Sequence, residues 1–487
     1  MEDLQHTECC PIKQIEELKE WEPSFVKYAS APLRKRIPVD DSPKTLICHD
    51  MRGGYLEDKF VHGCKAEDCY YFIHWSLVDS FVYFSHHLVT IPPCGWISAA
   101  HQNGVKVLGT FITEWDAGEK VCEELFKDSN NVLHYSRQLV RIAAFYNFDG
   151  WLINIENKLK INQIPLLKQF INVLTDMMHS FRSHSLVIWY DSVIESGDLK
   201  WQNALNEHNR DFFYGCDGIF LNYNWKDEDL KLSVSEAGLR KTDVYVGLDV
   251  FGRGCLGGGG FSTNIAAEEA RKYGLSIAIF APGWVHECLD VKDFPVNQQK
   301  FWSALNEVCT ARAFKNLPFA SSFCPGFGKK LFRNGKVVCN EPWYNISLQQ
   351  PQPTFYSSHS SKGNNVVMHI EDAYNGGGCL CLNGRFNDCK KFYDFMILST
   401  EFALENSYII SYTFKSLVNG LDVTLILDIQ CYEGSYELCL TEEKENEIIP
   451  VDASVKYKMP ASRNELLNTT YKETDENLLY ETNWIKR

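Results

Sequence analysis

The segment 149–157 carries an amide and a carboxylic acid two residues apart. It reads Asp-Gly-Trp-Leu-Ile-Asn-Ile-Glu-Asn, so one apolar residue separates Asn154 from Glu156. If the segment is a strand, both side chains point to the same side, because successive side chains of a strand alternate. A carboxyl group can give a proton to a reacting group, and a neighbouring amide can orient that group. The pair therefore predicts acid/base chemistry at the end of a strand.

This pair suits a glycosidase that takes its nucleophile from the substrate. Glu156 would protonate the leaving oxygen while the 2-acetamido carbonyl of the sugar attacks the anomeric carbon, as in the substrate-assisted exceptions to the two-carboxylate scheme. Asn154 would hold the acetamido group and stabilise its developing charge. The alternative is a polar pair that only caps a loop. The similar segment 217–222 disfavours that alternative, because polar ends of apolar strands are costly to bury unless they serve a site.

The elements around this segment predict the fold. From residue 45 to 281 short β-branched or aromatic runs alternate with longer amphipathic segments, which is typical of repeated βα units. Eight parallel strands close a TIM barrel, whose reacting groups lie at the C-terminal ends of the strands. We therefore expect an α/β fold with a (β/α)8 barrel over residues 45–312. The eight predicted strands are 45–48, 81–85, 105–112, 150–155, 186–189, 218–221, 244–248 and 276–280.

The polar and aromatic residues that end these strands or follow them are the candidate site residues. Besides Asn154 and Glu156 they are His49, Asp50, Glu114, Trp115, Tyr190, Asp191, Asn222, Trp225, Asp249 and Trp284. Glu114 could act as a second catalytic carboxylate, but hydrogen bonds to sugar hydroxyls or to Asn154 are the favoured role. Exposed aromatic rings in a cleft could stack on sugar faces, although most aromatic residues fill cores.

The chain outside the barrel divides into two further parts. Residues 1–44 are expected to form an extension that packs on the barrel. Beyond residue 312 the pattern changes to strand alternation, with Val423, Leu425, Leu427 and Ile429 on one face, and similar runs occur at 366–370, 408–414 and 435–440. We therefore expect a β-sandwich accessory domain over residues 313–487.

Several segments together resemble one family of enzymes. They are 49–55 (His-Asp-Met-Arg-Gly-Gly-Tyr), 109–115 (Gly-Thr-Phe-Ile-Thr-Glu-Trp), the Asn154/Glu156 segment, 189–192 (Trp-Tyr-Asp-Ser) and 201–203 (Trp-Gln-Asn). In this order they resemble glycoside hydrolase family 85, the endo-β-N-acetylglucosaminidases. The resemblance covers most of the chain.

The resemblance implies an activity and a set of roles. The substrate would be an N-glycan, free or on a glycoprotein or glycopeptide, cut at the β-1,4 bond of its N,N'-diacetylchitobiose core so that one N-acetylglucosamine stays on the protein or peptide. Glu156 would be the acid/base, Asn154 would orient the acetamido group, and Tyr190 would assist an oxazoline intermediate. Trp201 and Trp225 resemble aromatic residues that flank the acceptor side.

Two other functions remain open at this point. The chitinase-like family places Asp-Gly-x-Asp-x-Asp-x-Glu on the corresponding strand, but here Leu152 and Asn154 replace the two middle acids, which favours family 85. A catalytically inactive glycan-binding barrel is the second alternative, and the presence of Glu156 disfavours it.

Composition indicates which binding partners are disfavoured and in which compartment the protein is expected. The formal charge of -15 disfavours binding to nucleic acid, and no apolar run approaches the roughly 20 residues that span a bilayer. Met1–Gln5 lack the basic flank and apolar stretch of a secretory signal, and the 18 cysteines show no repeating framework, so we expect reduced thiols in the cytosol. The spacing of His62, Cys64, Cys69 and His74 fits no common zinc site, and no metal or organic cofactor is expected.

Overall fold

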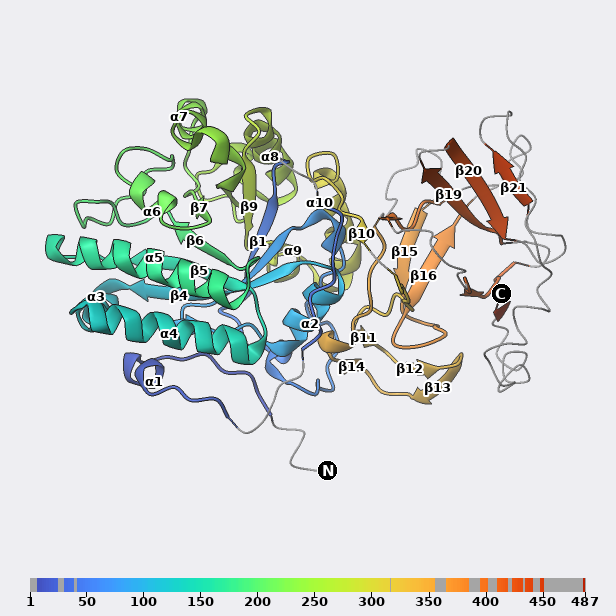
Figure 1. Cartoon of the computed structure of the whole chain (residues 1–487). Coiled ribbons are helices and arrows are strands. Elements are labelled where there is room, and N and C mark those ends of the chain that lie inside the picture. The colour runs from blue at the N-terminus through green and yellow to red at the C-terminus, as the bar shows by residue number, and fades with distance from the viewer. Residues whose placement is uncertain are drawn as a thin grey trace. The chain divides into compact units, whose positions relative to one another are not determined.

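A closed barrel of parallel strands lies in the first of two compact units of the chain (Figure 1). Each strand pairs in parallel with its two neighbours, and the pairing of β2 with both β1 and β4 closes the ring. The predicted (β/α)8 barrel is therefore confirmed. Its strands are β1 (Thr45–Asp50), β2 (Ser80–Phe84), β4 (Lys106–Glu114), β5 (Gly150–Glu156), β6 (Leu186–Tyr190), β7 (Gly218–Phe220), β8 (Val244–Asp249) and β9 (Ser276–Phe280). The two-residue strand β3 (Val89–Thr90) pairs antiparallel with β4.

This computed structural model describes the barrel continuously and later parts of the chain in segments. The described residues are 7–24, 30–38, 42–315, 317–354, 365–384, 395–401, 410–418, 423–431, 434–440, 447–450 and 485–486.

Helices cover the outside of the barrel between successive strands. In Figure 1, α4 and α5 lie side by side along it. Both bury a predicted apolar stripe, with Leu139 and Ile142 on α4 and Leu167 and Phe170 on α5 fully buried. The helices are α1 (Ile15–Lys19), α2 (Cys94–Gln102), α3 (Trp115–Leu125), α4 (Ser129–Tyr146), α5 (Ile164–Phe181), α6 (Arg210–Tyr214), α7 (Asp227–Ala237), α8 (Thr263–Lys272), α9 (Trp284–Glu287) and α10 (Phe294–Leu305).

Two hydrophobic clusters separate the inside of the barrel from its outside. The larger cluster fills the space between strands and helices, and the smaller one fills the barrel interior. Leu152 on β5 and Ile188 on β6 belong to the interior cluster. Because side chains alternate along a strand, the residues two and four positions later also face the interior. The interior residues are Leu46, Cys48, Val82, Phe84, Leu108, Ile112, Leu152, Ile188, Tyr190, Phe220, Tyr245 and Ala278.

The described part of the N-terminal segment contacts the barrel at several points. Ile12 forms a bridge with Val89, and Arg36 donates hydrogen bonds to the backbone carbonyls of Trp75, Val78 and Asn103.

Further small sheets follow the barrel. Within the first of two compact units, β10 (Phe314–Lys315) pairs with β17 (Thr400–Glu401), β11 (Phe327–Gly328) with β14 (Trp343–Tyr344), and β15 (Asn365–His369) with β16 (Cys379–Asn383). In the second unit, β18 (Thr413–Phe414) pairs with β22 (Ile485–Lys486), and β19 (Leu425–Cys431), β20 (Gly434–Leu440) and β21 (Glu447–Pro450) form one sheet. Two more short strands are β12 (Leu331–Arg333) and β13 (Lys336–Cys339).

The alternation predicted for β19 is present, since Leu425, Leu427 and Ile429 are half-buried and the residues between them are exposed. The predicted strand at 408–414 is described only from residue 410, and 451–484 lie outside the described residues. The sandwich arrangement and the domain boundaries stay predictions.

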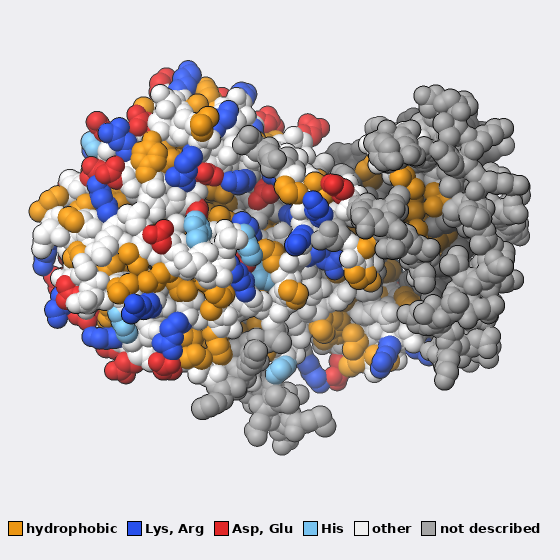
Figure 2. All heavy atoms as spheres, in the orientation of Figure 1, with side chains coloured by type: hydrophobic (Ala, Val, Ile, Leu, Met, Phe, Trp, Pro, Cys, Tyr) orange, Lys and Arg blue, Asp and Glu red, His pale blue; other side chains and the backbone are white. Residues whose placement is uncertain are grey.

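Two properties of the surface follow from this fold. Figure 2 shows acidic and basic side chains interspersed over this face of the barrel, with hydrophobic side chains between them. None of the helices in the described ranges is both long and apolar enough to cross a bilayer.

Candidate active site

The C-terminal end of β5 places Asn154 and Glu156 on the interior side of the barrel. They follow Leu152 at steps of two, and Leu152 belongs to the interior cluster. Asn154 is 4% exposed and Glu156 is half-buried. The amide thus lies one step deeper than the carboxyl group, and the carboxyl group lies where the strand ends.

The surroundings of Glu156 favour its protonated form. Burial is the main cause and the negative charge of Glu114 is the second, and together they raise the pKa of Glu156 to about 7. A hydrogen bond from the Trp201 indole N–H and the charge of His86 act in the opposite direction. A carboxyl group with a pKa near 7 can give and take a proton at neutral pH.

The amide of Asn154 has an unpaired acceptor. Its side-chain oxygen is buried, and no donor among the described residues bonds to it. Buried polar atoms are normally paired, and leaving one unpaired costs about 1–3 kcal/mol. A donor supplied by a bound ligand would recover that cost.

Glu114 lies directly beside Glu156. The two residues are register partners on the neighbouring parallel strands β4 and β5, so both side chains point to the same side of the sheet. The carboxylate of Glu114 is also bonded to His86 in the loop after β2, with His86 Nδ1 3.1 Å and 3.2 Å from its two oxygens. Glu114 therefore contacts a histidine and faces the acid, and it is not bonded to Asn154.

A chain of hydrogen bonds fixes Tyr190 at the end of β6. Its hydroxyl donates to Asn222 Oδ1 at 3.0 Å, and Asn222 Nδ2 donates to Asn203 Oδ1 at 2.8 Å. Asn203 Oδ1 also accepts the backbone N–H of Asn224 at 3.0 Å. Because a backbone N–H can only donate, this bond fixes the orientation of the Asn203 amide and therefore that of the Asn222 amide. Burial raises the pKa of the Tyr190 hydroxyl well above its usual value, so the hydroxyl stays protonated.

Asp191 anchors the loop that carries Trp201 and Asn203. Its carboxylate is fully buried and accepts backbone N–H groups of Gln202 and Asn203 and the side-chain amide of Asn209. Burial raises the pKa of Asp191 to about 6, against the effect of these hydrogen bonds. The loop after β6 is thus tied to the strand end by one carboxylate.

Two further aspartates end β1 and β8. Burial raises the pKa of Asp50, and the charges of His86 and Arg253 oppose that shift. Asp249 is 1% exposed and bonded to the Arg253 guanidinium, with Nε 2.7 Å from Oδ2 and Nη2 3.1 Å from Oδ1. Asp249 therefore holds the loop after β8 and is less open to a ligand than Asp50.

The four predicted tryptophans lie in different surroundings. Trp115 is 79% exposed at the start of α3, with a positive φ of 55° that is uncommon for a large side chain. Trp201 is 43% exposed, and its indole N–H opposes the rise in the pKa of Glu156. Trp284 is partly buried and packs edge-on against Phe261. Trp225 is 5% exposed, and its indole N–H donates to the carbonyl of Gly247, so its ring packs in the core instead of joining the other site residues.

Sequence reasoning missed His86, although its signal was available. The residues Ser85-His86-His87 directly follow β2, just as the other candidates follow their strands. It also left Asn203 without a role of its own. The buried candidate His49 instead stacks on Tyr70 and Phe81 outside the barrel interior.

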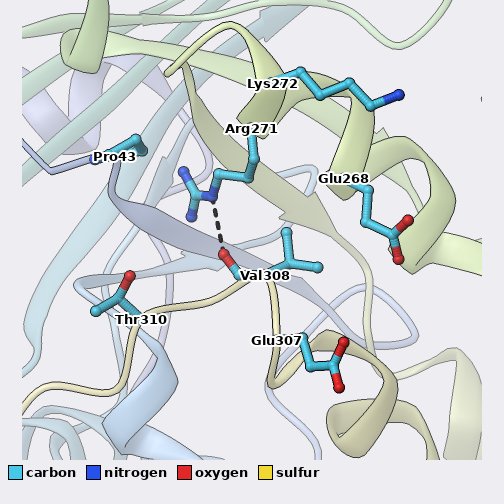
Figure 3. Close-up of a pocket in the computed structure, with 7 residues that line it drawn as sticks. All are labelled: Pro43, Glu268, Arg271, Lys272, Glu307, Val308 and Thr310. Carbon is cyan, nitrogen blue, oxygen red and sulfur yellow. Dashed lines mark hydrogen bonds between the residues drawn. The ribbon is translucent and has the colours of Figure 1, made fainter.

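A pocket at the other end of the barrel is shown in Figure 3. The Arg271 guanidinium in it donates hydrogen bonds to the carbonyls of Lys44 and Leu275, which directly precede β1 and β9, and to the carbonyl of Val308 after α10. In Figure 3 the charged ends of Lys272 and Glu268 point away from this arginine. The arginine is thus used in packing. Within the described ranges, no cluster of three or more His, Cys, Asp or Glu residues could hold a metal ion.

Comparisons with known proteins identify relatives of this chain. The chain is 47% identical over 384 residues to the cytosolic endo-beta-N-acetylglucosaminidase of Homo sapiens, and the matched region covers 77% of this chain and 52% of that protein. It is 45% identical over 428 residues to the protein of the same name from Danio rerio, covering 86% of this chain and 60% of that protein. The chain thus spans between about half and three fifths of these relatives' length.

A solved structure and a family model extend the comparison. The glycoside hydrolase domain of Endo-D from Streptococcus pneumoniae R6 has the same fold, with a TM-score of 0.64 at 23% identity, covering 77% of this chain and 66% of that chain. The family model described as Glycosyl hydrolase family 85 matches residues 55–331, which include β2 to β9 and all the site residues except Asp50. The chain therefore belongs to glycosyl hydrolase family 85.

Proposed function

We propose that this protein is an endo-β-N-acetylglucosaminidase. It hydrolyses the β-1,4 bond between the two core N-acetylglucosamine residues of N-glycans and leaves one of them on the protein or peptide. Membership of family 85 and relatives named as cytosolic endo-beta-N-acetylglucosaminidases support this proposal. The same relatives, together with the sequence evidence for reduced cysteines, support a cytosolic location.

The observation that carries the proposal is the pairing of a poised acid with an unpaired amide on one strand. Glu156 has a pKa of about 7, and the amide oxygen of Asn154 beside it lacks a donor among the described residues. A 2-acetamido sugar supplies what this arrangement lacks, since its N–H is a donor and its carbonyl oxygen is a nucleophile. The arrangement supports substrate-assisted cleavage.

The reaction proceeds in two halves. In the first, Glu156 gives its proton to the leaving oxygen while the acetamido carbonyl attacks the anomeric carbon, so the bond to the leaving sugar breaks and an oxazoline protonated on its nitrogen forms. Asn154 binds the acetamido group and aligns it for this attack. In the second half, Glu156 takes a proton from a water molecule, whose oxygen attacks the anomeric carbon and opens the oxazoline. Because each half inverts the anomeric carbon, the product retains the β configuration.

The other residues bind or position the sugar. The Tyr190 hydroxyl, held by Asn222, assists the oxazoline. Asp50 and Glu114, at the ends of β1 and β4, are acceptors for sugar hydroxyls. Trp115, Trp201 and Trp284 offer aromatic faces, and Trp201 lies on the acceptor side next to Glu156. Asp249 shapes the loop after β8, and Trp225 supports that side of the barrel from the core.

The remaining parts of the chain have supporting roles. Residues 1–44 extend the barrel, residues 45–312 carry the chemistry, and residues 313–487 form an accessory β-domain. No metal or organic cofactor takes part, because proton transfer and the substrate's own amide supply the chemistry.

The test is turnover of a high-mannose glycopeptide, followed by mass spectrometry. Wild type should release the glycan and leave one N-acetylglucosamine on the peptide. Glu156→Gln should keep the fold and lose about 10²–10⁴-fold in turnover. Glu123→Gln, which changes an exposed glutamate on α3, is the matched control and should retain wild-type turnover. Glycan binding without cleavage by wild type would refute the proposal in favour of an inactive glycan-binding barrel.

A further inference from the structure

A histidine without a role in the proposed reaction lies next to the acid. His86 Nδ1 is 3.1 Å from Glu114 Oε2 and 3.2 Å from Oε1, so the ring contacts both oxygens of the carboxylate. Its ring packs edge-on against Phe84 at the end of β2, with 5.4 Å between the centroids. Glu114 is the more buried partner, with 18% of its side chain exposed against 58% for His86. The contact thus joins the loop after β2 to the end of β4.

Glu114 transmits this contact to Glu156. Neighbouring strands lie about 4.8 Å apart, and the two glutamates are register partners on β4 and β5. Two carboxylates this close disfavour each other's ionisation, and the Glu114 charge is the second cause, after burial, of the raised pKa of Glu156. A positive charge on His86 opposes the Glu114 charge and so lowers the pKa of Glu156.

Three carboxylates from three strands act on His86, and the adjacent His87 also interacts with it. Glu114 from β4 contacts it, and Asp50 from β1 and Glu156 from β5 act on it at longer range. The bond to Glu114 is the main cause that raises the pKa of His86, and burial opposes the shift. Burial is the main cause that lowers the pKa of the neighbouring His87, so the pKa values of the two adjacent histidines shift in opposite directions.

Fixed cations near this group act on other residues, since Lys13 acts on the adjacent His87 and Arg253 acts on Asp50. Arg253, in the loop after β8, is bonded to Asp249 and acts on Asp50. Glu287 on α9 adds a negative charge near Asp50. The His86 ring is the group in contact with Glu114, and when it is protonated its charge also acts on Glu156.

We propose that His86 is a positioning residue that sets the pH range in which Glu156 works. By binding Glu114 and offsetting its charge, His86 limits how strongly Glu114 holds the proton on Glu156, so that Glu156 can both release the proton and recover it near neutral pH. This inference rests on the proposed acid/base role of Glu156.

The experiment compares pH–rate profiles of kcat/KM on one glycopeptide for wild type, His86→Gln, Glu114→Gln and His87→Gln. Turnover needs protonated Glu156, so it falls as pH rises through the pKa of Glu156. His86→Gln should move this fall to higher pH by about 0.5–1 unit, because the Glu114 charge is then unopposed. Glu114→Gln should move it to lower pH by a similar amount, and His87→Gln should leave it in place.

A second measurement is independent of turnover. Protein labelled with ¹³C-histidine is titrated by NMR, and the His86 signal is assigned by its loss in His86→Gln. The His86 titration should lie above the ordinary histidine range in wild type and return toward it in Glu114→Gln.

The outcomes separate this inference from the proposed function. The role of His86 would be overturned if the pH–rate profile of His86→Gln equalled that of wild type, or if His86→Gln and Glu114→Gln moved the profile in the same direction. Either result would leave the enzyme assignment intact. An ordinary His86 titration would overturn the role of His86 as well. Absence of cleavage by wild type at every pH would instead overturn the proposed function, and the NMR titration would still decide whether His86 carries the charge.

Discussion

Replacing Asn154 with alanine should lower turnover without lowering the free energy of unfolding. Its unpaired buried oxygen destabilises the fold by about 1–3 kcal/mol, and the replacement removes that cost. The lost side chain leaves roughly 30 Å³ of space, which at about 24 cal/mol per Å³ costs about 0.7 kcal/mol. The free energy of unfolding should therefore stay the same or rise by up to about 2 kcal/mol. Turnover should fall about 10²–10³-fold, because a group that binds the developing charge is gone.

Asn157 provides the matched control. It is 3% exposed, close to the 4% of Asn154, and lies directly after the same strand. Its amide is paired, donating to the carbonyl of Lys158 at 3.1 Å and contacting the Cys122 thiol. Asn157→Ala should therefore lower the free energy of unfolding by about 1–3 kcal/mol, the opposite sign.

The assay joins denaturant unfolding to two substrates. On the natural glycan, Asn154→Ala should be slow. Given a synthetic glycan oxazoline, which already contains the bond that Asn154 helps to form, it should still transfer the sugar to an N-acetylglucosamine acceptor, with Glu156 as base. The product should accumulate, because the variant re-forms the oxazoline slowly. Equal destabilisation by Asn154→Ala and Asn157→Ala would refute the claim that the Asn154 amide oxygen is unpaired. Unchanged hydrolysis of the natural glycan by Asn154→Ala would refute the role of Asn154 in aligning the acetamido group.

Two other predictions concern stereochemistry and the far end of the barrel. The first product released should be the β anomer, seen by proton NMR before mutarotation; a predominantly α product would mean direct attack by water. Asp149→Ala should lower the free energy of unfolding by about 3–5 kcal/mol, because Asp149 is fully buried and bonded to His101 at 2.7 Å. Asp198→Ala, which breaks an exposed pair with Lys158, should leave the melting temperature unchanged. Equal stability of the two aspartate variants would contradict the buried pair.

The barrel and the orientation of β5 were predictable because they depend on local patterns. Each strand is a short apolar run, and period-two alternation alone places Asn154 and Glu156 on one side once Leu152 faces the interior. The helical stripes of α4 and α5 are equally local. Elements with such periodicity are fixed by their own sequence, so their existence could be read before their packing was known.

The contacts of the site depend on loops, and local patterns do not describe them. Trp201 and Trp225 both follow strands, yet the loop held by Asp191 exposes the first while the second is buried against Gly247. The bond between His86 and Glu114 joins residues 28 apart in sequence. Its effect on Glu156 also requires the register of β4 against β5, which a single sequence does not contain.

The same register bears on which group is the nucleophile. Conventional retaining glycosidases use two carboxyl groups about 5–5.5 Å apart on either side of the bond, and Glu114 and Glu156, register partners on β4 and β5, are the candidates for such a pair. They lie side by side on adjacent strands, however, and Glu114 is held by His86. A carboxylate held in this way is a weaker nucleophile, whereas Asn154 offers an unpaired amide to the acetamido group. Glu114→Gln decides between the two: loss of the nucleophile would abolish turnover at every pH, whereas the substrate-assisted reaction would continue with its pH profile moved to lower pH.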